Sequence, residues 1–167
     1  MTGHLTEHTS SDEATAKVAG LIKGIRVAML TSIDPQGRLV SRPMATQDVD
    51  FDGDVWFIAE RSAEHTLNLR TRPQVNVAYA SSSSWVSLAG TAEVVDDPAR
   101  LEEYWNTFTD AWMEGGPGNP ENILIHVHAD TAEYWDSPGS KVTQVVNLVK
   151  AKVTGERYEG DNKVVDL

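Results

Sequence analysis

Apolar residues recur at helical spacing near the start of the chain. The residues that share this spacing are Ala14, Val18, Leu21, Ile22 and Ile25. They predict a first helix over about residues 12–23. Ser10 and Glu13 stand three apart at the start of this run, as in a capping box that satisfies the free N–H groups of a helix start.

From Arg26 onward the apolar period falls to two, which predicts a strand over residues 27–33. The next four residues, 34–37, read Asp-Pro-Gln-Gly, a turn composition in which proline presets φ and glycine accepts a positive φ. Residues 38–44 return as a second strand and complete a hairpin.

The remaining predicted elements are short. Further strands are expected at 54–59, 74–81, 85–95, 122–127 and 131–135. Ser62 is expected to cap a short helix that ends near Thr71, before Pro73. A longer helix should begin at Asp97-Pro98 with Leu101, Trp105 and Phe108 on one stripe, and a last one should follow Pro138-Gly139.

Six or seven short strands with helices at their edges predict a mainly β protein of the α+β type, an antiparallel barrel or sheet. A doubly wound parallel sheet is disfavoured because helices do not follow each strand. We expect a disordered N-terminus over 1–11, one domain over 12–152 and a polar tail over 153–167.

Composition narrows the function classes. The 167 residues fit a single domain, and the net charge of -11 disfavours nucleic acid and anionic membranes as partners. The chain has no cysteine, which excludes thiol catalysis and zinc–thiolate sites. No apolar run reaches membrane-spanning length and no signal-peptide pattern is seen at the N-terminus, so a cytoplasmic protein is expected.

Arg42 is the most informative polar residue because the strand pattern places it between Val40 and Met44 on one face. A guanidinium there needs a partner, either a carboxylate of this chain or a bound anion such as phosphate. The turn into the short helix, residues 60–65, could add His65 or Arg61 to an anion site, or could be a plain connection.

Other candidates carry weaker signals. His126 and His128 point the same way on a strand, but no third ligand accompanies them, so we expect solvated histidines and no metal. Trp105 and Trp112 stand seven apart and predict a packed helix face or a dimer contact. Trp135, at the end of a strand, could cover a flat aromatic ligand or plug the end of a barrel.

Four segments in order resemble the general stress protein branch of the pyridoxamine phosphate oxidase-like family. They are Ser41-Arg-Pro-Met44, the stretch 56–77 with Arg72-Pro-Gln-Val75, Trp85-Val-Ser-Leu-Ala-Gly-Thr-Ala-Glu93, and Glu133-Tyr-Trp-Asp-Ser-Pro-Gly139. The resemblance implies a six- to seven-stranded antiparallel split β-barrel with flanking helices. It also implies a homodimer that binds FMN in a groove at the interface between the two chains.

By position in this pattern, Arg42 resembles the family's phosphate-binding arginine, and His65 stands where the family has a lysine near the phosphate. Pro43, Met44 and Ala45, with Ile58 and Ala59, resemble the strands beside the flavin ring. Ser87 resembles a residue that faces the cofactor, and Trp135 resembles a tryptophan contributed by the partner subunit.

Departures from the pattern bear on activity. Glu64 and His65 replace two cations, Gln47 replaces a lysine of the oxidases, and their Arg-x-His substrate motif has no counterpart. Oxidation of pyridoxamine phosphate is therefore not expected. The resemblance implies an FMN-dependent oxidoreductase of unidentified substrate, with FAD or a deazaflavin as alternative cofactors. A non-enzymatic flavin-binding or stress-responsive protein and a deazaflavin-dependent reductase remain as alternatives, since no residue stands out as a catalytic acid or base.

Overall fold

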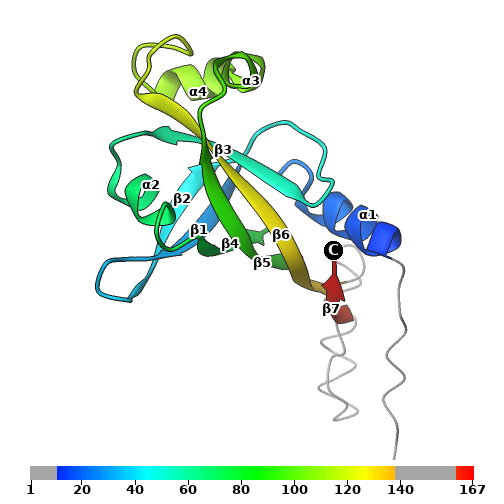
Figure 1. Cartoon of the computed structure of the whole chain (residues 1–167). Coiled ribbons are helices and arrows are strands. Elements are labelled where there is room, and N and C mark those ends of the chain that lie inside the picture. The colour runs from blue at the N-terminus through cyan, green and yellow to red at the C-terminus, as the bar shows by residue number, and fades with distance from the viewer. Residues whose placement is uncertain (1–10, 138–160) are drawn as a thin grey trace, which may run out of the picture.

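The computed structural model describes residues 11–137 and 161–167, which form one antiparallel sheet with four helices around it (Figure 1). In chain order the elements are α1 Ser11–Ile22, β1 Val27–Ile33, β2 Leu39–Ala45, β3 Asp54–Glu60, α2 Glu64–Leu69, β4 Gln74–Ala80, β5 Ser84–Val95, α3 Pro98–Tyr104, α4 Thr107–Trp112, β6 Asn122–Asp136 and β7 Asp161–Asp166.

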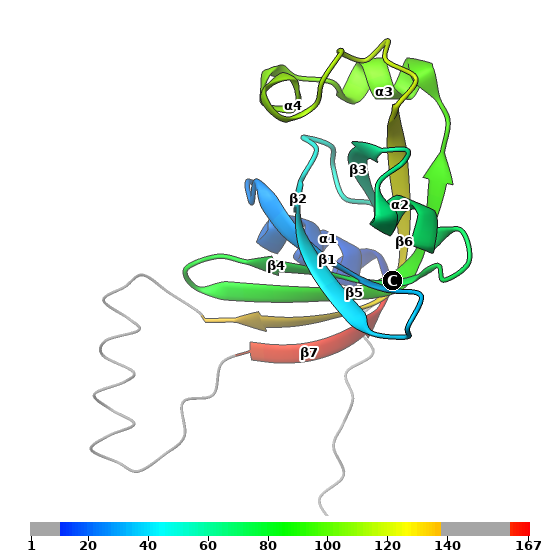
Figure 2. The ribbon, with the colours of Figure 1, turned by 90° about the vertical axis from the view of Figure 1, so that its left-hand side faces the viewer.

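The strand order is β2-β1-β4-β5-β6-β3, and β7 pairs with the second half of β6. The sheet curls on itself without closing, which confirms the expected split β-barrel with flanking helices. In both ribbon views α3 and α4 stand at one end of the sheet, while β7 lies at the other (Figures 1 and 2). Helix α1 packs near the β7 end, where Lys17 Nζ lies 2.6 Å from Asp136 Oδ2 of β6.

The two longest strands, β5 and β6, bend together where their register shifts between Ala89 and Gly90. A bulge of this kind bends a strand and increases its local twist. Gly90 is required at this point, because a Cβ there would overlap the carbonyl oxygen of His128. Figure 2 shows β5 and β6 passing from one layer of the sheet into the other.

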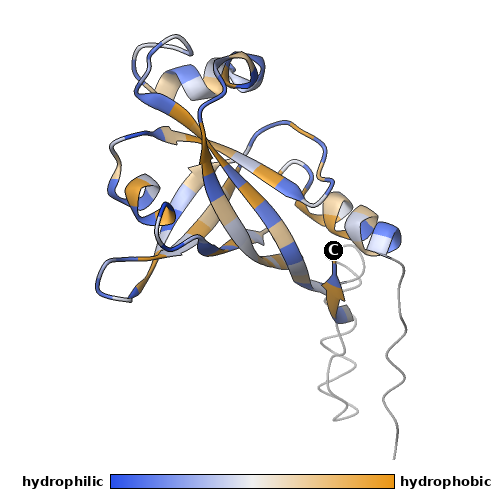
Figure 3. Cartoon of the chain, viewed as in Figure 1, coloured by the Kyte–Doolittle hydropathy of each residue, from blue (hydrophilic) through white to orange (hydrophobic). Residues whose placement is uncertain are grey.

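The core fills the inside of the curled sheet. Hydrophobic and hydrophilic residues alternate along the strands (Figure 3), as expected for a sheet with one buried face. Fully buried side chains of this core are Val18, Leu30, Phe57, Leu69, Val77, Val86, Leu88, Ile125 and Val127. Burying each such side chain contributes roughly 1.5–3 kcal/mol. A smaller cluster under α3 is built on Ile58, Leu101 and Leu124.

Three local predictions need correction. The single helix expected after Asp97 is two, because the Asn106 side chain accepts hydrogen bonds from the N–H groups of Phe108 and Thr109 and starts α4 afresh. The two strands expected at 122–127 and 131–135 are one continuous strand, β6. Ser62 does not cap α2, whose N-cap is Ala63; the Ser62 N–H donates to Glu121 instead.

The chain ends also differ from expectation. The sequence places residues 153–167 in a polar tail, but Asp161–Asp166 pairs with β6 as β7, and Val165 packs against the core. The expected disorder of residues 1–11 and the expected helix after Pro138 fall largely or wholly outside the described residues, although Ser11 is already the first residue of α1.

The bulge gives a first testable prediction. Gly90→Ala should lower the free energy of unfolding by about 1–3 kcal/mol, because the new methyl group collides with backbone that cannot easily move. Gly20→Ala is the matched control. It lies in α1 with open space around its Cβ, so the same change should stabilise by up to about 1 kcal/mol. Urea denaturation of both variants tests this, and equal effects would contradict the close approach at Gly90.

Candidate functional site

An apolar groove of about 320 Å³ opens between the sheet and α4. Its residues come from the hairpin β1–β2, the end of β3, the start of α2 and the α4 region. They are Val27, Pro43, Met44, Ala45, Gln47, Ile58, Ala59, Glu60, Ala63, His65, Phe108, Thr109, Trp112 and Met113. Six of the nine residues predicted for a cofactor site therefore lie together in one groove.

The α4 side of the groove is aromatic. Phe108 is 43% exposed and Trp112 is 72% exposed, and their ring centroids are 6.1 Å apart. Neither residue was predicted from the sequence to belong to a site, and Trp112 was expected to share a helix face with Trp105. The helix break at Asn106 separates the two. Trp105 packs in the smaller cluster and donates from Nε1 to Asp110, whereas Trp112 lines the groove.

His65 is the main titratable group inside the groove. Burial, with a smaller contribution from the nearby Arg42 guanidinium, lowers the pKa of its imidazole from 6.5 to about 4. The ring is therefore neutral at pH 7, and its Nε2 atom is buried with no hydrogen-bond partner among the described residues. Gln47 Oε1, which also lines the groove, is likewise buried and has no hydrogen-bond partner among the described residues. Such buried polar atoms are costly unless a ligand or water satisfies them.

Arg42 lies on β2 opposite Leu30, next to the groove, and is half-buried. A carboxylate of this chain was one of the two partners expected for it, but no ion pair or hydrogen bond joins Arg42 to any residue within 11–137 or 161–167. The Arg42 guanidinium also contributes to the lowered pKa of His65, as expected for a nearby cation. The groove is lined mainly by apolar residues. His65 lines it and Arg42 precedes Pro43, a groove residue of β2, so we call Arg42 and His65 its polar end.

Arg61 does not contribute to this end. Its guanidinium lies 2.9 Å from Asp96 Oδ2, and its Nε donates to the carbonyl oxygen of Pro120 at 3.0 Å. Arg61 is therefore already paired with a carboxylate of this chain, and it is not among the residues that line the groove. Of Arg42, Arg61 and His65, only Arg42 and His65 therefore belong to the polar end of the groove.

Ser87 and Trp135 lie elsewhere, on the outer face of the sheet. Ser87 Oγ accepts a hydrogen bond from Asn76 Nδ2 at 2.7 Å, and Trp135 stands opposite Trp85 across the β5–β6 pair. Both residues belong to a broad exposed face that also carries Met29 of β1. Within one chain they are not part of the groove, and their predicted contact with a cofactor needs a second chain.

The two histidines of β6 meet Asp54 of β3. Asp54 Oδ1 lies 3.0 Å from His128 Nδ1 and 3.1 Å from His126 Nε2, and Glu93 lies 3.2 Å from the other nitrogen of His126. The hydrogen bond to Asp54 raises the pKa of His128. His126 is not a freely solvated side chain as expected, since it stacks on Trp56 at 4.2 Å. In the described part of the chain, no three His, Asp or Glu side chains are arranged to hold a metal ion.

Residues 13–159 match the family model described as pyridoxamine 5'-phosphate oxidase like. The chain belongs to this family. The match covers the groove and every strand of the sheet except β7. No helix in the described residues is both long and apolar enough to cross a membrane.

Three relatives place the chain within the family. Protein bli-3 of Neurospora crassa is 26% identical over 87% of this chain and 75% of its own length. The structure of a protein assigned as general stress protein 26 from Jannaschia sp. CCS1 has a TM-score of 0.77 and 26% identity, covering 93% of this chain and 99% of that one. The general stress FMN/FAD binding protein of Xanthomonas citri has a TM-score of 0.65 and 28% identity, covering 78% and 93%. The chain therefore resembles general stress proteins of this family in both sequence and fold.

The environment of His65 gives the second prediction. Its imidazole signals should not titrate between about pH 5.5 and 8, whereas His128 should titrate above its ordinary pKa of 6.5. Unfolded His65 takes up a proton near pH 6.5 and folded His65 only near 4, so the free energy of unfolding should fall as pH decreases through this window.

Arg42→Ala should raise the pKa of His65, because a neighbouring cation disfavours the imidazolium. Histidine-detected NMR titration of both proteins measures these values. A wild-type His65 that titrates near 6.5 would contradict its burial beside Arg42.

Proposed function

We propose that this family member binds FMN in the groove and serves as a flavin-dependent oxidoreductase-like protein of the general stress type. The observation that carries the proposal is the half-buried Arg42, which lacks a counter-ion within the described residues and stands beside a neutral histidine with an open Nε2 atom. A phosphate group accepts hydrogen bonds from both and neutralises the guanidinium.

The rest of the groove fits a flat aromatic ring system. Pro43, Met44 and Ala45 on one strand and Ile58 and Ala59 on the next form an apolar floor. Phe108 and Trp112 form the facing wall. The unpartnered Gln47 amide oxygen is an acceptor that suits an N–H group of a flavin or of a related deazaflavin. The relative from Xanthomonas citri is an FMN/FAD binding protein, which supports the same class of ligand.

A second chain would complete the groove. Val27 and Pro43 line it and share the outer face of the sheet with Met29, so the groove opens onto that face. One row across this face runs through Met29, Ala78, Ser87, Glu133 and Val164. Exposed apolar side chains on the same face are Val27, Met29, Trp85, Trp135 and Val164. An isologous homodimer through this face would cover them and bring Trp135 of the partner subunit towards the groove.

The flavin would supply hydride or electron transfer. The residues of this chain would bind the phosphate, orient the ring and exclude water. The titratable groups among the groove residues are His65, which is neutral, and Glu60 at the edge. This lack of a poised acid or base favours, as second candidate, a flavin-binding protein without steady turnover. Reduction of bound flavin by NADH or NADPH, followed over many turnovers, separates the two candidates.

Arg42 gives the direct test of the proposed site. Arg42→Ala should raise the dissociation constant for FMN roughly tenfold to a hundredfold, because it removes a charge-assisted contact to phosphate. Riboflavin, which lacks the phosphate, should bind both proteins about equally. Fluorescence titration with each flavin measures this.

Arg70→Ala is the matched control, since Arg70 is exposed at the end of α2 and outside the groove. It should leave the affinity for FMN unchanged. If Arg42→Ala unfolds the protein or leaves the preference for FMN over riboflavin intact, Arg42 is a structural residue and the phosphate site is misplaced.

Assembly gives a separate prediction. Light scattering at micromolar concentration should report twice the chain mass of 18.3 kDa. Met29→Asp should shift the protein to a monomer, because it buries a charge at the centre of the proposed interface. Leu67→Asp, at an exposed apolar position on α2, should not. A monomeric wild type would remove the proposed role of Trp135.

A further inference from the structure

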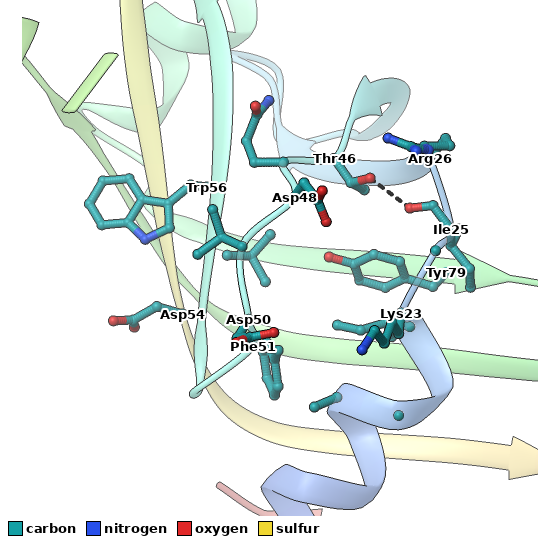
Figure 4. Close-up of a pocket in the computed structure, with 17 residues that line it drawn as sticks. Lys23, Ile25, Arg26, Thr46, Asp48, Asp50, Phe51, Asp54, Trp56 and Tyr79 are labelled. Atoms are coloured by element: carbon teal, nitrogen blue, oxygen red, sulfur yellow. Dashed lines mark hydrogen bonds between the residues drawn. The ribbon is translucent and has the colours of Figure 1, made fainter. Parts of the chain in front are cut away.

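A second cavity, of about 340 Å³, lies beside the C-terminal end of α1 (Figure 4). Its walls are the α1–β1 connection, the loop 46–53 between β2 and β3, the start of β3 and Tyr79 of β4. It shares only Gln47 with the groove. At roughly 30 Å³ per water, it has room for one small organic molecule.

Tyr79 is the polar group at the bottom of this cavity. The residue is only 4% exposed, and burial raises the pKa of the phenol so that it is neutral at physiological pH. Figure 4 shows the hydroxyl pointing into the cavity. No hydrogen bond to it comes from the residues that the structure describes. Because the hydroxyl faces the cavity, it is available to a ligand as both donor and acceptor.

The charged residues of the cavity are segregated. Lys23 and Arg26 come from the α1–β1 connection, and Asp48 and Asp50 come from the facing loop (Figure 4). None of the four forms an ion pair with another residue of the described ranges. Asp54, at the rim, is already engaged by His126 and His128. Two cations and two carboxylates therefore stand on opposite sides, with no counter-ion in this part of the chain.

Between these charges the cavity is apolar. Ile22, Val55 and Phe51 line it and pack against the main core. Trp56 also lines it, but one ring face stacks on His126 and Arg100 lies over the ring at 4.5 Å, so Trp56 is already fixed in position. The cavity thus has a rigid apolar body with opposite charges at its two sides.

We propose that this cavity binds a small zwitterion with an aromatic or aliphatic body, of the amino acid class. Its carboxylate would face Lys23 and Arg26, its ammonium group would face Asp48 and Asp50, and one of these polar groups would bond the Tyr79 hydroxyl. A singly charged ligand would satisfy one side and leave the other unpaired, which favours a zwitterion over an anion or a cation.

Three probes that share one ring test the charge requirement on the purified full-length protein. They are L-phenylalanine, 3-phenylpropionate and 2-phenylethylamine, titrated by calorimetry and by NMR. L-phenylalanine should bind at least about tenfold more tightly than either singly charged probe. Equal binding of all three, or no binding of L-phenylalanine at millimolar concentration, would overturn the proposal.

Variants then locate the site. Tyr79→Phe removes only the hydroxyl and should weaken L-phenylalanine by about twofold to tenfold, whereas Tyr104→Phe, outside the cavity, should have no effect. Lys23→Met should weaken L-phenylalanine and 3-phenylpropionate but not 2-phenylethylamine. Asp50→Asn should weaken L-phenylalanine and 2-phenylethylamine but not 3-phenylpropionate.

Lys23 and Asp50 are exposed, so these two variants carry the test even if Tyr79→Phe does not fold. Unchanged affinities in both would show that the probe binds elsewhere and would overturn the proposal. Since FMN is absent from every arm, failure here leaves the proposed flavin site untouched.

Discussion

The pairing of β5 with β6 is the interaction on which the architecture depends. These strands form the longest ladder of the sheet, and β6 also pairs with β3 at one end and with β7 at the other. Because the ladder bends at Gly90, one half faces the α3–α4 end and the other half forms the flat exposed face. Strand β3, whose end lines the groove, pairs with the half of β6 on the α3–α4 side of the bend, so the bend helps to set the position of β3 relative to the β1–β2 hairpin.

The distribution of charge is the second constraint. In a chain of net charge -11, a half-buried arginine would ordinarily find a carboxylate. Some carboxylates of the described residues are paired elsewhere, as with Asp96 to Arg61 and Asp136 to Lys17, and none of the ion pairs among these residues involves Arg42. Arg42 is kept apart from them by its position on the inner side of β2, beside a histidine that burial holds neutral. The arrangement concentrates positive potential at one point of an acidic molecule, which suits a small anionic group and disfavours a polyanion.

The features that could be predicted from the sequence are those set by short-range interactions. Strands such as β1 and the turn ending at Gly37 follow from local period and backbone preference, and they were predicted closely. The break at Asn106 depends on a side-chain cap, whereas the apolar stripe through this region predicts one continuous helix. The sequence predicts two strands where β6 is continuous, because the two predicted runs are separated by the residues at which the register shifts. The groove residues on β2 and β3 came from family resemblance, whereas Phe108 and Trp112 reach the groove only through tertiary packing that no local pattern encodes.

The opening of the groove onto the exposed face of the same sheet has a thermodynamic consequence. If one surface both seats a ligand and joins two chains, the two equilibria cannot be independent. Dilution would release ligand as it separates the chains, and ligand would in turn hold the chains together at concentrations where the empty protein dissociates. The apparent affinity for the ligand would then depend on the protein concentration as well as on the groove. The total concentration of the protein would set the fraction of chains that carry a ligand.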